Sequence, residues 1–171
     1  MARTFGSDLQ GVAAIEFAVF ALFLLLAIVN VTDVSMYIYQ RMEAENATQG
    51  AALAAWKTCG PNQLPATTNC PGLSNAIQNA LGGTSLGTRV SLVSGSPSEG
   101  YYCVNSSSAL QYMSGVSSKP SDCSAAGSPG VQPGDYLQIT TRFGYVPLFP
   151  GLSIASTFAT PINTTTMMRL S

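Results

Sequence analysis

The chain has 171 residues, a formal net charge of -1 and no histidine, and 9% of its residues are charged, against about 25% in an ordinary soluble domain. This composition excludes Ser/His/Asp and Cys/His catalysis, and the seven scattered basic residues give no electrostatic footprint for nucleic acid. We therefore expect a non-enzymatic protein with no cofactor, no metal and no nucleic-acid partner. The length allows about one folded domain.

An apolar run near the N-terminus predicts a transmembrane helix over residues 12–31. Only Glu16 and Asn30 are polar in this run, and ~20 helical residues rise about 30 Å, the thickness of the hydrocarbon core of a bilayer. A cleavable signal peptide is the competing interpretation, but its apolar core is about 7 to 15 residues long and ends at a small-residue cleavage site. The run is longer and continues into Thr32 and Asp33, which favours a membrane span.

The same helix is predicted to continue beyond the span, over residues 32–58. This segment contains no proline and is rich in residues that favour helix. The following Cys59-Gly60-Pro61 predicts a stop, with Gly60 in the left-handed conformation. A stripe of small side chains at helical spacing would admit the backbone of another helix, or pack under the protein's own head domain, and both interpretations stay open. The stripe consists of Ala44, Ala47, Ala51 and Ala55.

All four cysteines follow the predicted span. Without histidine and without a C-x-x-C pair they make a poor zinc site, so we expect disulfides. About three pairings are open for four cysteines; the sequential pairing, Cys59 with Cys70 and Cys103 with Cys123, closes short loops worth roughly 3 kcal/mol each in the chain-entropy model. Because disulfides persist in oxidising compartments, we expect the N-terminus in the cytoplasm and the cysteines across the membrane.

Glu16 is the residue of the predicted span that most needs an explanation. A carboxylate inside a membrane helix costs a few kcal/mol on insertion scales, so it is a functional candidate. The alternative interpretation is that Glu16 lies shallow enough to reach the headgroups or is protonated.

The residues around Glu16 read Gly-Val-Ala-Ala-Ile-Glu-Phe from position 11 to position 17. This motif resembles the processing site of type IV pilins, in particular the G-x-x-x-x-E-F form of the Flp and tight-adherence (Tad) systems. The resemblance implies that a membrane prepilin peptidase cuts between Gly11 and Val12, which leaves residues 1–11 as a cytoplasmic leader and places Glu16 and Phe17 in the processing and assembly motif. The new ammonium at Val12 would be neutralised by Glu16 of a neighbouring subunit, since pairing removes the cost of an isolated charge in a low dielectric.

The rest of the chain is similar to the TadE-like minor pseudopilins. Their plan has an aspartate near the membrane exit, an Ala-rich stretch and a small β-rich domain, which Asp33, residues 47–55 and the closing segments 136–145 and 154–169 match. The resemblance implies an α+β, pilin-like fold: a long N-terminal helix, then a small antiparallel head domain with disulfide-held loops over residues 59–171.

The first part of the head domain contains one predicted helix and one predicted hairpin. Leu73, Ile77 and Leu81 lie at i, i+4 and i+8, which indicates a short helix with one buried face. Residues 89–93 alternate as a strand and are expected to pair with residues 101–104.

The second part of the head domain combines loops with two predicted strands. Residues 94–134 are rich in Ser, Gly and Pro and are expected to form loops held by a disulfide. Residues 136–143 alternate polar and apolar, as in a half-buried strand. Residues 154–160 are expected to be its antiparallel partner, at an edge of the sheet or broken by Pro161. We expect three or four strands packed on the long helix.

These observations predict a single-pass protein of a bacterial inner membrane, with its C-terminal domain in the periplasm or carried into an extracellular pilus. It would be processed, join pilin and minor pseudopilin subunits through its N-terminal helix, and help assemble, prime or cap a Tad pilus. Two alternatives remain. One is an uncleaved membrane protein whose head binds pilus or secretion components, and the other is an adhesin-like module that uses its Ser-rich loop.

Overall fold

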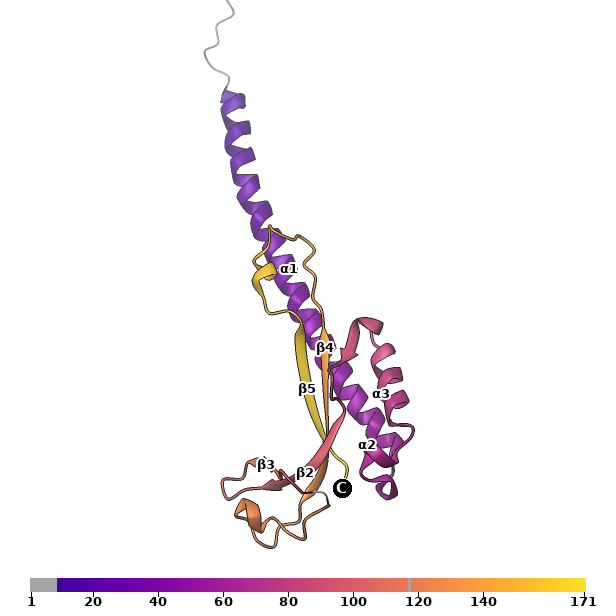
Figure 1. The fold of residues 1–171 in the computed structure, drawn as a ribbon. Coiled ribbons are helices and arrows are strands. Elements are labelled where there is room, and N and C mark those ends of the chain that lie inside the picture. Colours follow the sequence, from indigo (N-terminus) through magenta and orange to yellow (C-terminus); the bar gives the residue numbers. More distant parts are fainter. Residues whose placement is uncertain (1–8, 117) are drawn as a thin grey trace, which may run out of the picture. The chain divides into compact units, whose positions relative to one another are not determined.

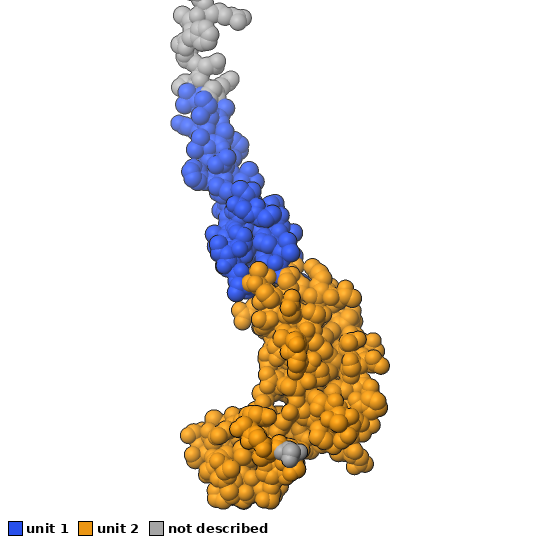
Figure 2. Space-filling model, viewed as in Figure 1, with its two compact units in different colours: residues 1–39, 145–159 blue, residues 40–144, 160–171 orange. Residues whose placement is uncertain are grey.

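The computed structural model describes residues 9–116 and 118–171. Its first element is helix α1, Leu9–Thr58, the single long helix that the sequence predicts (Figure 1). Most of the predicted leader, residues 1–8, lies outside the described residues. The chain divides into two compact units, residues 1–39 with 145–159 and residues 40–144 with 160–171 (Figure 2).

Helix α1 ends directly before the predicted stop. Gly60 has φ -75° and ψ 165°, which is extended backbone, so the prediction of a left-handed glycine is wrong. The reason lies in the next residue: a proline disfavours the helical conformation of the residue before it. Pro61 then begins the one-turn helix η1, Pro61–Gln63, where its fixed φ suits a first helical position.

Two short helices follow in unit 2, α2 (Ala66–Asn69) and α3 (Leu73–Gly82). The predicted face of α3 is confirmed, because Leu73, Ile77 and Leu81 are all buried. A one-turn helix, η2 (Gly87–Arg89), leads into the sheet.

The described part of the head contains one antiparallel sheet built around β4, with five strands where three or four were expected. Strand β5 pairs with β4 from Tyr136↔Arg169 to Phe143↔Ile162 and fills one edge of it. Strands β1 and β2 pair in tandem with the two ends of β4, so they share its other edge. Strand β3 pairs with β2. The strands are β1 (Val90–Leu92), β2 (Ser98–Val104), β3 (Leu110–Tyr112), β4 (Gly134–Phe143) and β5 (Ile162–Arg169).

Two predicted pairings are wrong. Residues 89–93 and 101–104 do not form a hairpin, because β4 is ten residues long and accommodates β1 and β2 one after the other on a single edge. Residues 154–160 are not the partner of β4: residues Ile154–Thr157 form the one-turn helix η4. The partner strand starts at Ile162, after Pro161, which has no N–H to give to a strand ladder. Among the described strands β5 pairs with β4 alone, so β5, and not the predicted segment 154–160, lies at an edge of the sheet.

The Ser-rich segment 94–134 is more ordered than expected, because it contains β2, β3 and the one-turn helix η3 (Ser124–Ala126). Only Cys103 of β2 is buried and all of β3 is exposed, so these strands carry no alternation of apolar and polar residues that a sequence could display.

The small-residue stripe of α1 belongs to the core of unit 2. The four alanines at positions 44, 47, 51 and 55 are each at most 1% exposed. On β4 the alternation predicted for residues 136–143 is confirmed, with Leu137, Ile139 and Phe143 buried. The head domain of the same chain therefore covers the stripe.

Candidate functional site

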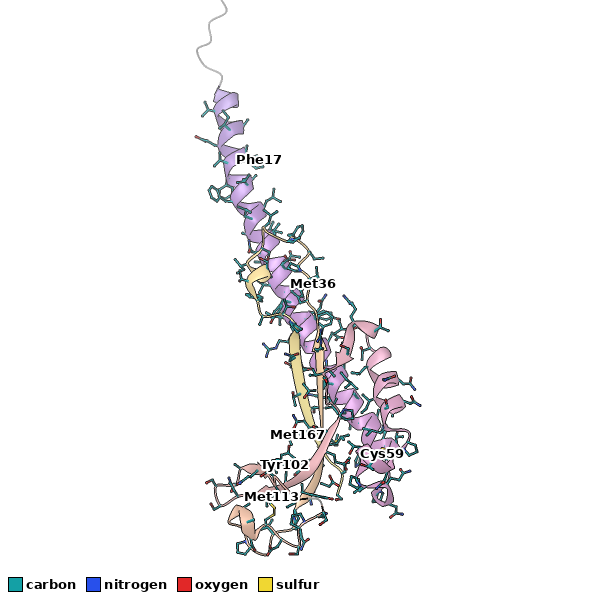
Figure 3. The ribbon with its side chains drawn as sticks, in the orientation of Figure 1. Phe17, Met36, Cys59, Tyr102, Met113 and Met167 are labelled. Carbon is teal, nitrogen blue, oxygen red and sulfur yellow. A yellow bond between two sulfur atoms is a disulfide. The ribbon has the colours of Figure 1, made fainter. Side chains whose placement is uncertain are left out.

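The first half of α1 presents an apolar surface to its surroundings. Every side chain from Val12 to Phe20 is exposed, and Phe17 is 72% exposed. Figure 3 shows the side chains of this stretch, Phe17 among them, pointing outward from the helix. In the described part of the chain, α1 is the one helix long and apolar enough to cross a membrane. An exposed apolar surface of this length requires lipid or other apolar helices around it.

The predicted processing residues lie at the start of the apolar run of α1. Gly11 and Val12 belong to the first turns of α1, and Glu16 follows on the same exposed face, one turn from Val12. Between residues that the structure describes, the one ion pair is Arg41–Glu45, with Nε and Oε1 3.2 Å apart and both side chains exposed. No described basic side chain therefore compensates the Glu16 carboxylate.

Asp33 joins α1 to a loop far away in the sequence. Its side chain is fully buried and accepts the backbone N–H groups of Leu148, at 2.9 Å, and Phe149, at 3.2 Å. Its own carbonyl oxygen accepts the hydroxyl of Tyr145 at 3.0 Å. Burial, and then the charge of Asp33, raise the pKa of the Tyr145 phenol, which keeps this hydroxyl a neutral donor.

Asn30 and Tyr37 hold the same loop on either side of Asp33. The Asn30 Oδ1 atom accepts the N–H of Ile154 at 2.9 Å. The Tyr37 ring packs edge-on against Tyr145 and Phe158, with centroids 5.1 and 4.8 Å apart. Positions 30, 33 and 37 are spaced by three and four residues, so they lie on one face of the helix. This face binds residues 145–159, hereafter the 145–159 loop.

Parts of this face were noted in the sequence, but their contact with the 145–159 loop was not predicted. The resemblance placed Asp33 near the membrane exit, but gave it no partner within the chain. The available signal was the common helical face of Asn30, Asp33 and Tyr37 at the end of the apolar run.

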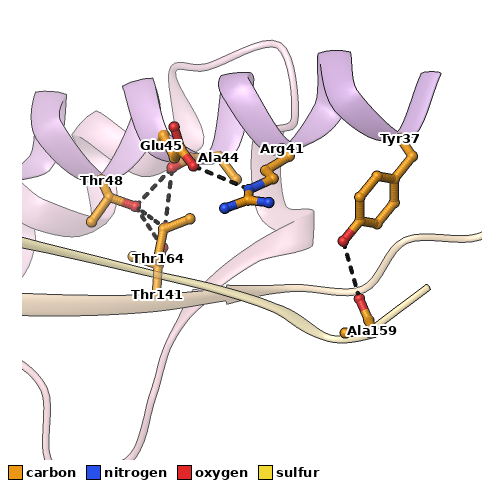
Figure 4. Close-up of polar contacts among 8 residues, drawn as sticks. All are labelled: Tyr37, Arg41, Ala44, Glu45, Thr48, Thr141, Ala159 and Thr164. Carbon is orange, nitrogen blue, oxygen red and sulfur yellow. Dashed lines mark hydrogen bonds and ion pairs between the residues drawn. The ribbon is translucent and has the colours of Figure 1, made fainter. Parts of the chain in front are cut away.

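Three buried threonine hydroxyls join α1 to the sheet in unit 2. The Thr48 Oγ1 atom lies 2.6 Å from that of Thr141 and 2.7 Å from that of Thr164, and the last two are 2.8 Å apart (Figure 4). Thr48 also donates to the carbonyl of Ala44 at 2.7 Å. Because each hydroxyl offers one donor and two acceptor positions, the three groups satisfy one another between the helix and strands β4 and β5.

Two carboxylates, those of Glu99 in β2 and Asp135 in β4, lie near each other where β4 begins. Glu99 accepts the N–H groups of Ala66, at 2.8 Å, and Thr67, at 2.7 Å, and so caps α2. Asp135 is 2% exposed, and its Oδ1 has no hydrogen-bond partner among the described residues. Burial, and then the neighbouring Glu99, raise the pKa of Asp135 to about 6, while Lys119 acts in the opposite direction. Both carboxylates line a cavity of about 150 Å³.

The cysteines form two disulfides with the sequential pairing. Cys59, just after α1, is bonded to Cys70 at the end of α2, and Cys103 of β2 is bonded to Cys123. The second bond forms the centre of a small buried cluster with Met113 and Ala126. Of the described residues, no group of three or more His, Cys, Asp or Glu side chains is placed to hold a metal ion.

The fold and this helix define a class: an α+β protein with a long, apolar N-terminal helix that can span a membrane, followed by a disulfide-linked antiparallel head. Comparison with known proteins gives a family match for part of the chain. Residues 11–57 match the model of the Flp pilus-assembly TadE/G-like family, which confirms the resemblance to TadE-like proteins of the Tad pilus and supports a role in pilus assembly. No curated protein and no solved structure matches the chain. The head beyond residue 57 lies outside the matched region.

Proposed function

We propose that this chain is a minor pseudopilin of the TadE type, processed by a prepilin peptidase and inserted in the bacterial inner membrane through the first half of α1. The proposal rests on one observation: the family match and the apolar run of α1 start at neighbouring residues. The family match begins at Gly11, and the apolar run of the sequence begins at Val12. The role is structural rather than enzymatic.

Cleavage would change the chemistry of this helix end. Hydrolysis of the Gly11–Val12 peptide bond leaves a carboxylate on Gly11 and an ammonium on Val12. Val12 and Glu16 are four residues apart on one helix face. The new positive charge therefore lies one turn from a carboxylate that has no partner among the described residues.

The exposed surface of the helix supports association with other subunits. When several such helices bundle, the ammonium of one subunit can pair with Glu16 of the next, and the apolar side chains around it leave water together. An unpaired charge in that bundle would be strongly destabilising, so charge pairing sets the register of neighbouring helices. This arrangement suits a subunit that starts or caps a pilus by offering its helix to the major pilin.

The disulfides support the proposed orientation. Both bonds lie after the span, and disulfides persist in oxidising compartments such as the periplasm. The head domain is therefore proposed to face the periplasm and the N-terminus the cytoplasm.

The N-terminal residue of the mature protein tests the proposal. In cells that carry the Tad system, N-terminal sequencing or intact-mass measurement should find Val12. The variant Gly11→Leu should abolish the cleavage, because a bulky side chain obstructs a protease that approaches the backbone at glycine. Gly6→Leu, a matched glycine before the span, should leave cleavage unchanged.

A mature chain that retains residues 1–11 would contradict the proposed processing. It would favour the alternative in which an uncleaved, membrane-anchored protein binds pilus or secretion components through its head.

A further inference from the structure

The 145–159 loop carries an apolar edge next to the proposed membrane span. Several of its large hydrophobic side chains are exposed: Val146 is 76% exposed, Leu152 is 62% exposed and Ile154 is 59% exposed. The loop contains no Asp, Glu, Lys or Arg. An edge of this kind in water would be costly, so it requires an apolar partner.

The helix face that holds the loop is also free of exposed charge. Between Phe17 and Gln40 the one charged residue of α1 is Asp33, and its carboxylate is buried against the loop. Residues 17–39 together with 145–159 thus form a continuous part of unit 1 that shows no charged side chain to its surroundings. This continuity joins the loop to the surface of the proposed span.

Many polar groups of the loop have hydrogen-bond partners within unit 1. Asp33 and Asn30 accept the N–H groups at the tip of the loop. The hydroxyls of the loop bond to backbone groups: Ser156 donates to Ser153 at 2.7 Å, and Thr157 donates to Ile154 at 2.7 Å. Backbone polar groups without partners are costly in lipid. This internal satisfaction makes the loop suited to a medium without water.

The depth of the loop follows from the helix. Residues 12–31 rise about 30 Å, which fills the hydrocarbon core. The loop is held by Asn30, at the end of this segment, and by residues that follow it as far as Tyr37. These residues reach the headgroup layer, where tyrosine side chains are enriched and amphipathic segments bury an apolar face about 5–10 Å deep.

We propose that the 145–159 loop inserts its apolar edge into the headgroup and acyl boundary of the bilayer, as a second membrane contact that fixes the depth of α1. The inference rests on the proposed membrane span of α1. The occupant of this surface is lipid rather than a second protein chain, because the uncharged surface is continuous with the proposed span and many of its polar groups already have partners within unit 1.

Single-tryptophan fluorescence of the full chain in lipid vesicles tests the proposal. The one native tryptophan, Trp56, is first replaced in a Trp56→Phe background. Leu152→Trp then reports on the loop, Phe23→Trp on the span, and Val131→Trp on the head, all at exposed positions. The vesicles contain phosphatidylcholine and phosphatidylglycerol, with acyl chains brominated either near the carbonyl end or near the methyl end.

The loop tryptophan should show a blue-shifted emission and lose intensity mainly to the lipid brominated near the carbonyl end. The span tryptophan should be quenched by the deeply brominated lipid, and the head tryptophan by acrylamide in the water. The loop proposal is overturned if the loop tryptophan behaves like the head control while the span control is quenched by lipid. A blue-shifted loop tryptophan that no lipid quenches would also overturn it, in favour of a protein neighbour. Loss of lipid quenching in the Phe23→Trp variant as well overturns both the loop contact and the span.

Discussion

The buried carboxylate of Asp33 accepts the backbone N–H of Leu148, a residue 115 positions later in the chain, at 2.9 Å. This hydrogen bond and the neighbouring one to Phe149 connect the end of the apolar run of α1 to the 145–159 loop. Asp33 therefore stabilises a contact within its own chain, independent of any contact with other subunits.

Replacing Asp33 by Asn should loosen the 145–159 loop. The amide loses the charge-assisted acceptor and leaves one N–H of its own facing a backbone donor, a cost of about 1–3 kcal/mol. Amide hydrogen exchange of the 145–159 loop, measured on the full chain in detergent micelles, should accelerate roughly tenfold or more.

Asp122→Asn is the matched control for Asp33→Asn. Asp122 accepts the N–H groups of Ser124 and Gly130 in the head, so this variant should accelerate exchange there and leave the 145–159 loop unchanged. Equal amide exchange of the 145–159 loop in wild type and Asp33→Asn would show that Asp33 does not hold this loop on α1.

Thr48→Val should destabilise unit 2 by about 1–2 kcal/mol, because it removes one of three buried hydroxyls and leaves Thr141 and Thr164 with one partner fewer each. Denaturant unfolding of the full chain in detergent measures the change. Thr165→Val, which breaks the exposed contact between Thr140 and Thr165, should alter stability by less than about 0.5 kcal/mol. Similar effects of the two variants would show that burial of the threonine cluster contributes nothing.

The stability of the head should fall as the pH rises through the range set by Asp135. The folded state raises the pKa of this carboxyl from 3.8 to about 6, so between these values the folded chain binds more protons than the unfolded chain. Stability therefore decreases with rising pH over this interval. Asp135→Asn, which mimics the protonated group, should be more stable than wild type at pH 7 and should lose this slope.

The contribution of Asp122 to stability should change with pH in the opposite direction to that of Asp135. Hydrogen bonds from Ser124 lower the pKa of its carboxyl below 3.8, so its contribution is present above that pH and is lost as the pH falls further. Asp122→Asn should keep the slope between pH 4 and pH 6 that Asp135 produces. If stability still decreases with rising pH in the Asp135→Asn variant, another titratable group causes the decrease.

The two disulfides should protect different parts of the head. The double variant Cys103→Ser, Cys123→Ser should lower stability by about 3 kcal/mol and open the buried cluster around Met113. Limited proteolysis should then cut between residues 104 and 123. The double variant Cys59→Ser, Cys70→Ser should leave that segment protected while it releases α2 from the end of α1. The same cleavage pattern in both variants would contradict the separate roles.

Glu16→Ala should reduce pilus assembly without unfolding the chain. The side chain is exposed, and its loss leaves the Val12 ammonium of the processed chain uncompensated, at a cost of a few kcal/mol in an apolar bundle. Pilus counts by electron microscopy should fall on the order of tenfold or more. Glu45→Ala removes an exposed carboxylate that pairs with Arg41 outside the span, and should leave the counts unchanged. Normal assembly with Glu16→Ala would remove Glu16 from the assembly mechanism.

The sequence predicts the elements whose physical cause is local. The long helix follows from an apolar run, good helix formers and a Gly-Pro stop, and the alternation of β4 follows from one buried face. The helix face of Leu73, Ile77 and Leu81 is equally local.

The sequence does not predict the contacts made by backbone groups. Strand β3 is exposed, Cys103 is the one buried residue of β2, and the two strands pair through their main chains, so their side chains carry little pattern. Asp33 likewise binds N–H groups, which every residue except proline has. For this reason Leu148 and Phe149 could not be identified as its partners from residue types alone.

The contact between Asp33 and the 145–159 loop has a consequence for biosynthesis. Helix α1 is made first, while the residues that satisfy Asp33 are made after more than 100 intervening residues. The head sequence must be synthesised before the loop can close. A chain that stops before Leu148 therefore keeps a carboxylate without its N–H partners at the end of its apolar run. Such an incomplete chain differs chemically from a finished one at this end of the run.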